Sequence, residues 1–151
     1  YYNLTGSSRV LDVGCAKGFM LHDFIQVVPG ITVAGIDISQ YAIDSSMEDV
    51  SSFLRVGNAK DLSMFGNKSF DLVISINTIH NLKPEECKQA LAEIQRVGRH
   101  AFITVDAWRT PEEEVRMKKW NITAETCMHI DDWKRLFAEV GYAGDYYWFI
   151  P

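Results

Sequence analysis

A short apolar segment that runs into a loop of small residues constrains the fold of this chain more than any other feature. Residues 10–13 read Val-Leu-Asp-Val, and Gly14-Cys15-Ala16-Lys17-Gly18 follows directly. A buried strand, a small-residue turn and a helix are typical of the first unit of a parallel sheet, whose ligands bind at the carboxyl ends of the strands. Because Gly14, Ala16 and Gly18 leave little side-chain bulk, the backbone here can approach a ligand closely. The alternative is a glycine turn without a ligand.

The rest of the sequence continues with alternating strands and helices. Strand-like apolar segments lie at 9–13, 31–36, 52–56, 70–76 and 100–105, and an aromatic one lies at 145–150. Helical patterns lie at 18–28, 39–47, 84–97 and 130–140, and a short charged helix is expected from Pro111. This alternation predicts an α/β fold, a three-layer sandwich with a mostly parallel sheet between two layers of helices.

Composition limits the class of protein. The 151 residues suit one domain, and 47% hydrophobic residues are enough for a sizeable core. The net charge of −5 is a weak argument against a general nucleic-acid surface, and no apolar run has the length of a membrane span. Cys15, Cys87 and Cys127 lie far apart, so we expect no zinc site and no disulfide, and free thiols suit the cytoplasm.

The loop motif separates two families of nucleotide-binding proteins. Dinucleotide binding favours Gly-x-Gly-x-x-Gly, but Phe19 stands where the third glycine would be. The run Leu-Asp-Val-Gly-Cys-Ala-Lys-Gly instead resembles the first motif of class I S-adenosylmethionine (SAM) dependent methyltransferases, Asp-x-Gly-x-Gly-x-Gly, with Ala16 replacing the middle glycine. The resemblance implies the sheet order 3-2-1-4-5 and then a C-terminal strand, without the antiparallel seventh strand of the family. It also implies that SAM contacts Asp12, Gly14, Cys15, Ala16 and Gly18.

The ends of the next two strands extend the resemblance. Asp37 lies 23 residues after Gly14, where a carboxylate accepts hydrogen bonds from ribose hydroxyls, and Ile38 follows it. The alternative role of Asp37 is a loop carboxylate beside the helix cap Ser39. Gly57-Asn58-Ala59 resembles the Gly-Asp-Ala run whose acidic residue lies near the adenine amino group. Asn58 offers a carbonyl there, or is a turn residue.

The loop at the end of the fourth strand is expected to lie near the methyl group and the substrate. Phe-Asp-Leu-Val-Ile-Ser at 70–75, followed by His80 and Leu82, resembles the fourth motif of small-molecule SAM methyltransferases. The Asn-Pro-Pro-Tyr run of enzymes that methylate exocyclic amines of DNA bases is missing. The resemblance implies that Asn77 lies near the methionine part of SAM and that His80 faces the methyl group or the substrate.

Methyl transfer needs mainly positioning, and a general base helps where the acceptor is a hydroxyl or an amine. His80 is the first candidate because histidine titrates near neutral pH, and His129 and Asp106 follow. The alternative is that both histidines have packing or helix-entry roles. Trp108, Trp120 and the aromatic run 146–148 either line an acceptor pocket or belong to the core.

Two segments bear on the domain organisation. Residues 107–129 form a polar insertion, which in this family often serves as a substrate lid and is otherwise a solvated surface. Tyr1 begins just before the first strand and Pro151 follows an aromatic run. We therefore expect residues 1–151 to form a single domain of a longer protein.

The sequence thus predicts a SAM-dependent methyltransferase that acts on an oxygen, nitrogen or carbon atom. The acidic charge and the missing Pro-Pro-Tyr run favour a small-molecule acceptor over protein or nucleic acid. Two alternatives stay open, a module that binds SAM or S-adenosylhomocysteine without catalysis and an NAD(P)-dependent oxidoreductase. The sequence indicates neither the acceptor nor the oligomeric state.

Overall fold

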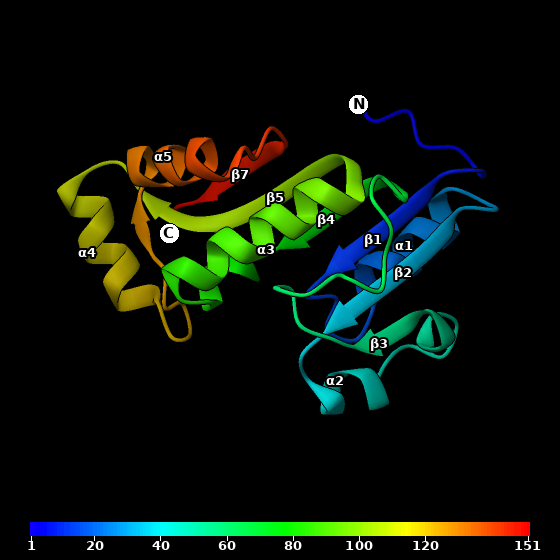
Figure 1. Cartoon of the computed structure of the whole chain (residues 1–151). Helices are drawn as coiled ribbons and strands as arrows, with labels where there is room; N and C mark the ends of the chain where they lie inside the picture. The colour runs from blue at the N-terminus through cyan, green and yellow to red at the C-terminus, as the bar shows by residue number, and fades with distance from the viewer.

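A central sheet of seven strands organises the computed structural model, which describes residues 1–151 (Figure 1). The strand order is β3-β2-β1-β4-β5-β6, and β7 pairs with β5. Every strand pair is parallel. The strands are β1 (Arg9–Val13), β2 (Thr32–Asp37), β3 (Leu54–Val56), β4 (Phe70–Ile76), β5 (Gly98–Trp108), β6 (Met128–His129) and β7 (Asp145–Phe149). The predicted α/β class and the order 3-2-1-4-5 followed by a C-terminal strand are confirmed.

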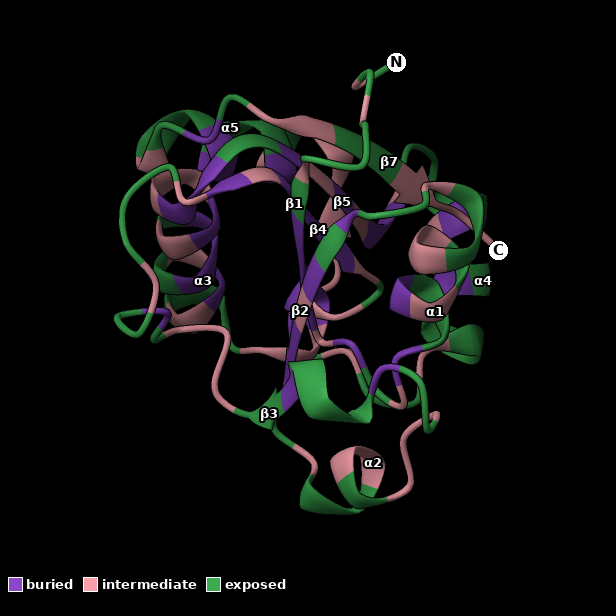
Figure 2. Ribbon diagram, turned by 90° about the vertical axis from the view of Figure 1, so that its right-hand side faces the viewer, coloured by how far each residue is buried: buried purple, intermediate pink, exposed green.

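Helices cover both faces of this sheet, as the predicted three layers require. Figure 2 views the sheet from its side, with α1 (Phe19–Val27) on one face and α3 (Pro84–Val97) on the other. The helix α5 (Ile130–Val140) packs beside α3. The remaining helices are α2 (Gln40–Asp44) and α4 (Pro111–Trp120).

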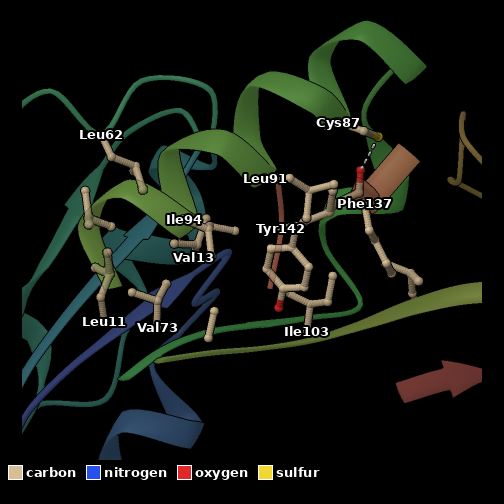
Figure 3. Packing of buried hydrophobic residues seen from close by; sticks show 14 of the residues in the cluster. Leu11, Val13, Leu62, Val73, Cys87, Leu91, Ile94, Ile103, Phe137 and Tyr142 are labelled. Carbon is tan, nitrogen blue, oxygen red and sulfur yellow. Dashed lines mark hydrogen bonds between the residues drawn. The ribbon is translucent and has the colours of Figure 1, made fainter. Parts of the chain in front are cut away.

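Two apolar clusters hold the layers together, one on each face of the sheet. On the α3 side, Leu91 and Ile94 point toward Val73 of β4 and Ile103 of β5, and all four side chains are buried (Figure 3). On the α1 side, Leu21 packs in a cluster with residues of β1, β2 and β4. Each fully buried aliphatic side chain contributes about 1.5–3 kcal/mol relative to an exposed one. The core therefore fixes the strand ends, where the loops gather.

Some elements differ in length from the sequence prediction. The strand predicted at 100–105 begins at Gly98 and extends to Trp108, because its last two residues pair with β6, a strand too short to recognise in the sequence. The helix predicted over 39–47 ends at Asp44, although Ser39 caps it as expected, accepting a hydrogen bond from Ala42 N–H. Because β5 is longer than predicted, residues 106–108 belong to the strand and not to a loop after it.

The helices are also short relative to a bilayer. None of them combines the length and the apolar character needed to cross a membrane.

Candidate functional site

The loop after β1 has a backbone that glycine makes possible. Gly14 has a φ of +87°, and a Cβ atom there would lie 2.2 Å from Thr78 Oγ1. The amides of Gly14 and Cys15 both donate to the carbonyl of Ile36, at 2.8 and 3.0 Å. The end of β2 therefore anchors this loop, and the conformation excludes a larger residue at position 14.

Asp37 joins two loops through both oxygens of its carboxylate. Oδ2 accepts a hydrogen bond from Ala16 N–H at 2.8 Å, and Oδ1 accepts one from Ser39 N–H at 2.9 Å. Each carboxylate oxygen has a second lone pair, so Asp37 can still accept from a ligand. The loop-carboxylate role and the predicted ribose role are thus compatible in one residue.

A cavity of about 480 Å³ opens over the carboxyl ends of β1, β2, β3 and β4. It brings together most of the residues predicted to bind SAM, although they come from four separate loops. Those that line it are Gly14, Ala16, Asp37, Ile38, Asn58, Ala59 and Asn77. We call it the first cavity.

Cys15 and Gly18 lie in the same loop but outside the lining of the first cavity. The Cys15 side chain is buried against Gly35, and burial raises the pKa of its thiol to about 12. Cys15 is therefore a small core residue without thiolate character at neutral pH. Gly18, with a φ of +84°, caps α1 and approaches Val50 and Leu54. Their contribution to a ligand site is the shape of the loop.

Asp12 lies behind the loop as a buried carboxylate. It is 4% exposed, and its Oδ1 atom has no hydrogen-bond partner. Burial, and then the negative charge of Asp37, raise the pKa of Asp12 to about 7. A buried carboxylate without a partner is costly, and a nearby cation would offset that cost.

Asn58 divides its polar atoms between a turn and the first cavity. Its Oδ1 atom accepts a hydrogen bond from Lys60 N–H at 3.1 Å, which is the predicted turn role. The NH2 group of the same side chain donates no hydrogen bond within the chain, and Asn58 lines the cavity.

A second cavity, of about 400 Å³, adjoins the first and shares Asn77 and Asn81 with it. Asn77 ends β4 with a φ of +52°. Its N–H donates to Thr104 Oγ1 at 2.8 Å, and its Oδ1 accepts from that hydroxyl at 2.7 Å. These bonds to β5 fix Asn77 in the wall between the two cavities.

His80 and Asp106 both line the second cavity and are 5% and 6% exposed. The backbone N–H of Asp106 donates to His80 Nδ1 at 3.1 Å, so the neutral ring carries its proton on Nε2. Burial lowers the pKa of His80 and raises the pKa of Asp106. Burial thus favours the neutral form of both groups, which makes the imidazole less basic and the carboxyl group more basic than usual.

His129 is not brought together with these residues. It lies at the start of α5, where Nδ1 accepts from Asp131 N–H at 3.2 Å and Nε2 lies 3.1 Å from the carbonyl of Arg109. Both ring nitrogens thus have partners within the chain, which is the helix-entry role considered above.

The insertion 107–129 supplies one wall of the second cavity through Trp120, Asn121, Ile122 and Thr123. Buried Glu113 fastens the start of α4, since its carboxylate accepts 2.7 Å hydrogen bonds from Arg109 N–H and from the Arg109 guanidinium. This arginine lowers the pKa of Glu113 to about 2.

Among the cavity-lining residues that sequence reasoning missed are Thr78, Asn81 and Phe149. Thr78 and Asn81 belong to the loop that was singled out for Asn77 and His80, so the loop itself was the available signal. Phe149 lies in the aromatic run 145–150, but nothing in the sequence indicates which of its side chains face the cavity. Trp108, also considered for an acceptor pocket, does not line the second cavity.

This strand order, with a glycine loop after the first strand and an acidic residue after the second, defines a class I SAM-dependent methyltransferase fold. Residues 10–101 match the family described as a methyltransferase domain, and the chain belongs to that family. The family membership implies SAM as the methyl donor.

Individual relatives cover the chain to different extents. It is 30% identical over 77 residues to ribosomal RNA small subunit methyltransferase C of Buchnera aphidicola, which is 50% of this chain and 23% of that protein. A putative methyltransferase of Haloferax volcanii, solved in complex with the Trm112 methyltransferase activator, matches 92% of this chain and 63% of its own with a TM-score of 0.74 and 22% identity. The YcgJ protein of Bacillus subtilis matches the same shares with a TM-score of 0.74 and 16% identity. The chain thus spans less than two thirds of these proteins.

The predicted preference for a small-molecule acceptor over protein or nucleic acid is wrong. A relative named as a ribosomal RNA methyltransferase and a structural neighbour bound to a protein activator contradict it. The physical reason is that net charge describes the whole surface, whereas a partner responds to the local field at its site.

Proposed function

We propose that this chain binds SAM in the first cavity and transfers its methyl group to an oxygen, nitrogen or carbon atom held in the second. The observation that carries this proposal is the shared wall of the two cavities, formed by Asn77 and Asn81. A donor in one cavity and an acceptor in the other would meet at that wall. Such an arrangement performs the positioning on which methyl transfer mainly depends.

The residues around the first cavity support SAM as its ligand. We assign Asp37 to the ribose hydroxyls, Asn58 and Ala59 to the adenine, and Asn77 to the methionine part. The partnerless carboxylate of Asp12 supports a cationic ligand, because SAM carries a sulfonium and an ammonium group. Bound SAM supplies a methyl carbon that its positive sulfur already activates.

The chain itself would orient the acceptor and receive a proton. We assign proton transfer to Asp106 and His80, because both are buried and line the second cavity. His129 has a capping role in this assignment, since both of its ring nitrogens have partners. We further propose that the insertion 107–129 is a lid, on the support of its residues in the cavity wall.

The state of the three cysteines bears on the cellular location of the protein. Cys15, Cys87 and Cys127 are all free, which supports a reducing cytoplasm as the location of the protein.

Calorimetric titration with S-adenosylhomocysteine, with NADH as the comparison ligand, tests the donor site. We expect binding of S-adenosylhomocysteine alone and a strong loss of affinity in Asp37→Ala. Asp44→Asn, which changes an exposed carboxylate on α2, is the matched control and should bind like the wild type. A folded wild-type chain that binds only NADH, or neither ligand, would contradict the proposal.

A further inference from the structure

The second cavity contains one acidic side chain without a hydrogen-bond partner, that of Asp106. Its side chain is 8% exposed, and no N–H or O–H of the chain donates to either of its oxygens. The nearest basic atom, His80 Nδ1, lies 3.7 Å from Oδ1 but already accepts the Asp106 backbone N–H. Two acceptors therefore face each other, and neither neutralises the other.

The amide oxygens of the other polar side chains around this cavity are occupied within the chain, whereas Asn77 Nδ2 and His80 Nε2 remain free to donate. Asn77 Oδ1 accepts from the Thr104 hydroxyl, and Asn81 Oδ1 accepts from the Thr123 hydroxyl at 2.8 Å. Asn121 bonds the backbone of Ala124 with both polar atoms of its amide group, at 2.9 and 2.7 Å. The acceptor that the cavity leaves free for a ligand is consequently the Asp106 carboxylate.

Two aromatic rings lie in the same cavity. Trp120 of the insertion and Phe149 of β7 have ring centroids 5.5 Å apart and planes inclined by 42°. Aromatic faces attract cations, and an alkyl chain also packs against them. A carboxylate and an aromatic pair together favour a cationic ligand that has an apolar part.

We propose that the methyl acceptor is an aliphatic amine, bound as an ammonium ion against Asp106 and beside Trp120 and Phe149. This inference rests on the proposed function, because it specifies the acceptor of the same reaction. A hydroxyl acceptor could donate a hydrogen bond to Asp106 but would bring no positive charge to it, and a carbon acceptor would bring neither. The proposal concerns the amine group, whichever molecule carries it.

The reaction balances with groups that the chain and SAM supply. The ammonium ion gives one proton to the Asp106 carboxylate, and the freed nitrogen lone pair forms a bond to the methyl carbon. The carbon–sulfur bond breaks, and its electron pair stays on sulfur. The products are an N-methylammonium ion, neutral S-adenosylhomocysteine and protonated Asp106, which returns its proton to water.

Binding of a matched pair of probes tests the proposal without knowledge of the natural acceptor. Benzylammonium and benzyl alcohol differ mainly in charge, and ligand-observed NMR gives their affinities with and without S-adenosylhomocysteine. We expect the wild type to prefer benzylammonium by about tenfold, since charge-assisted contacts are the stronger ones. Asp106→Asn should abolish this preference, whereas Asp23→Asn, on the exposed side of α1, should retain it.

Wild-type protein that binds benzylammonium no better than benzyl alcohol would overturn the proposal, whether or not S-adenosylhomocysteine binds. Failure of S-adenosylhomocysteine to bind would count against the proposed function alone. Transfer of labelled methyl groups from SAM to a set of alkylamines, or to a lysine-containing peptide, then distinguishes a free amine from a protein side chain. Label in ribosomal RNA alone, or in neither kind of amine, would also overturn the proposal.

Discussion

The first and second cavities lie side by side but differ in what forms their walls. The first is shaped by backbone, with Gly14 in a left-handed conformation and Asp37 accepting from two loop amides. The second is shaped by side chains from the loop after β4, from β5, from β7 and from the insertion, which meet only in the folded chain. A site made of loop backbone tolerates few sequences, whereas a site made of side chains can change its ligand through single substitutions.

Breaking the first cavity at Gly14 should have the largest effect. Gly14→Ala places a Cβ atom 2.2 Å from Thr78 Oγ1 at a positive φ, and we expect a loss of roughly 2–4 kcal/mol in unfolding free energy. Urea denaturation measures this loss, and calorimetry should show that S-adenosylhomocysteine binding is lost as well. Gly66→Ala is the control, because no atom lies within 4 Å of its added Cβ. Equal stabilities of the two variants would refute this account of the loop.

Removing one hydrogen-bond acceptor from the same cavity, at Asp37, should have a smaller effect. In Asp37→Asn, an amide group replaces one oxygen and faces a backbone N–H that needs an acceptor. We expect the affinity for S-adenosylhomocysteine to fall about 30-fold, or about 2 kcal/mol, with little change in the second cavity. The benzylammonium preference measures the latter. If the benzylammonium preference of this variant fell together with its affinity for S-adenosylhomocysteine, the two cavities would not bind their ligands independently.

The pH dependence of stability should report on Asp12. Its pKa in the folded chain is raised to about 7, whereas an unfolded aspartate has a pKa of about 4. The folded state therefore binds more protons between these values, and wild-type stability should fall as the pH rises from about 4 to about 7. Asp12→Asn removes this charge and should be more stable than wild type at pH 8 by about 1–2 kcal/mol.

Denaturation of both proteins across this pH range measures the difference. The same Asp12→Asn variant should bind S-adenosylhomocysteine more weakly, because the ligand keeps a positive ammonium group. A wild-type stability that rises between pH 4 and 7, relative to the variant, would show that Asp12 has a cationic partner in the free protein.

The smallest effect is expected from a substitution that weakens the wall of the second cavity. Glu113→Gln weakens the attachment of α4 to Arg109, and hydrogen exchange of residues 111–123 should accelerate about threefold. Binding of S-adenosylhomocysteine should stay unchanged, which sharpens the contrast between the cavities. Glu112→Gln, on the exposed side of the same turn, is the control. Equal hydrogen-exchange rates of residues 111–123 in the two variants would argue against the role of Glu113 in holding α4.

The same contrast explains which features the sequence predicted. The α/β class follows from the local alternation of strands and helices, the strand order was implied by the resemblance to SAM methyltransferases, and both are confirmed. The prediction also placed Asp37 and Asn77 at strand ends, where the parallel sheet brings them to one edge. Asn58 was predicted to lie near the adenine, with a turn role as the alternative, and its side-chain carbonyl has that turn role.

The acceptor side could not be predicted in the same way. His80 and Asp106 meet because β4 and β5 are neighbours and β5 is longer than its apolar core suggests. Trp120 and Phe149 lie 29 residues apart and come together only through the path of the insertion. The acceptor preference was wrong because the total charge of a chain says nothing about the single carboxylate in a cavity.

The position of Asn77 has a thermodynamic consequence. Since this residue and Asn81 belong to both cavities, a ligand that shifts them in one cavity changes the free energy of binding in the other. Such linkage is reciprocal, so any factor by which the donor changes acceptor affinity is the factor by which the acceptor changes donor affinity. We therefore expect substitutions of this asparagine pair to alter cooperativity between the two ligands.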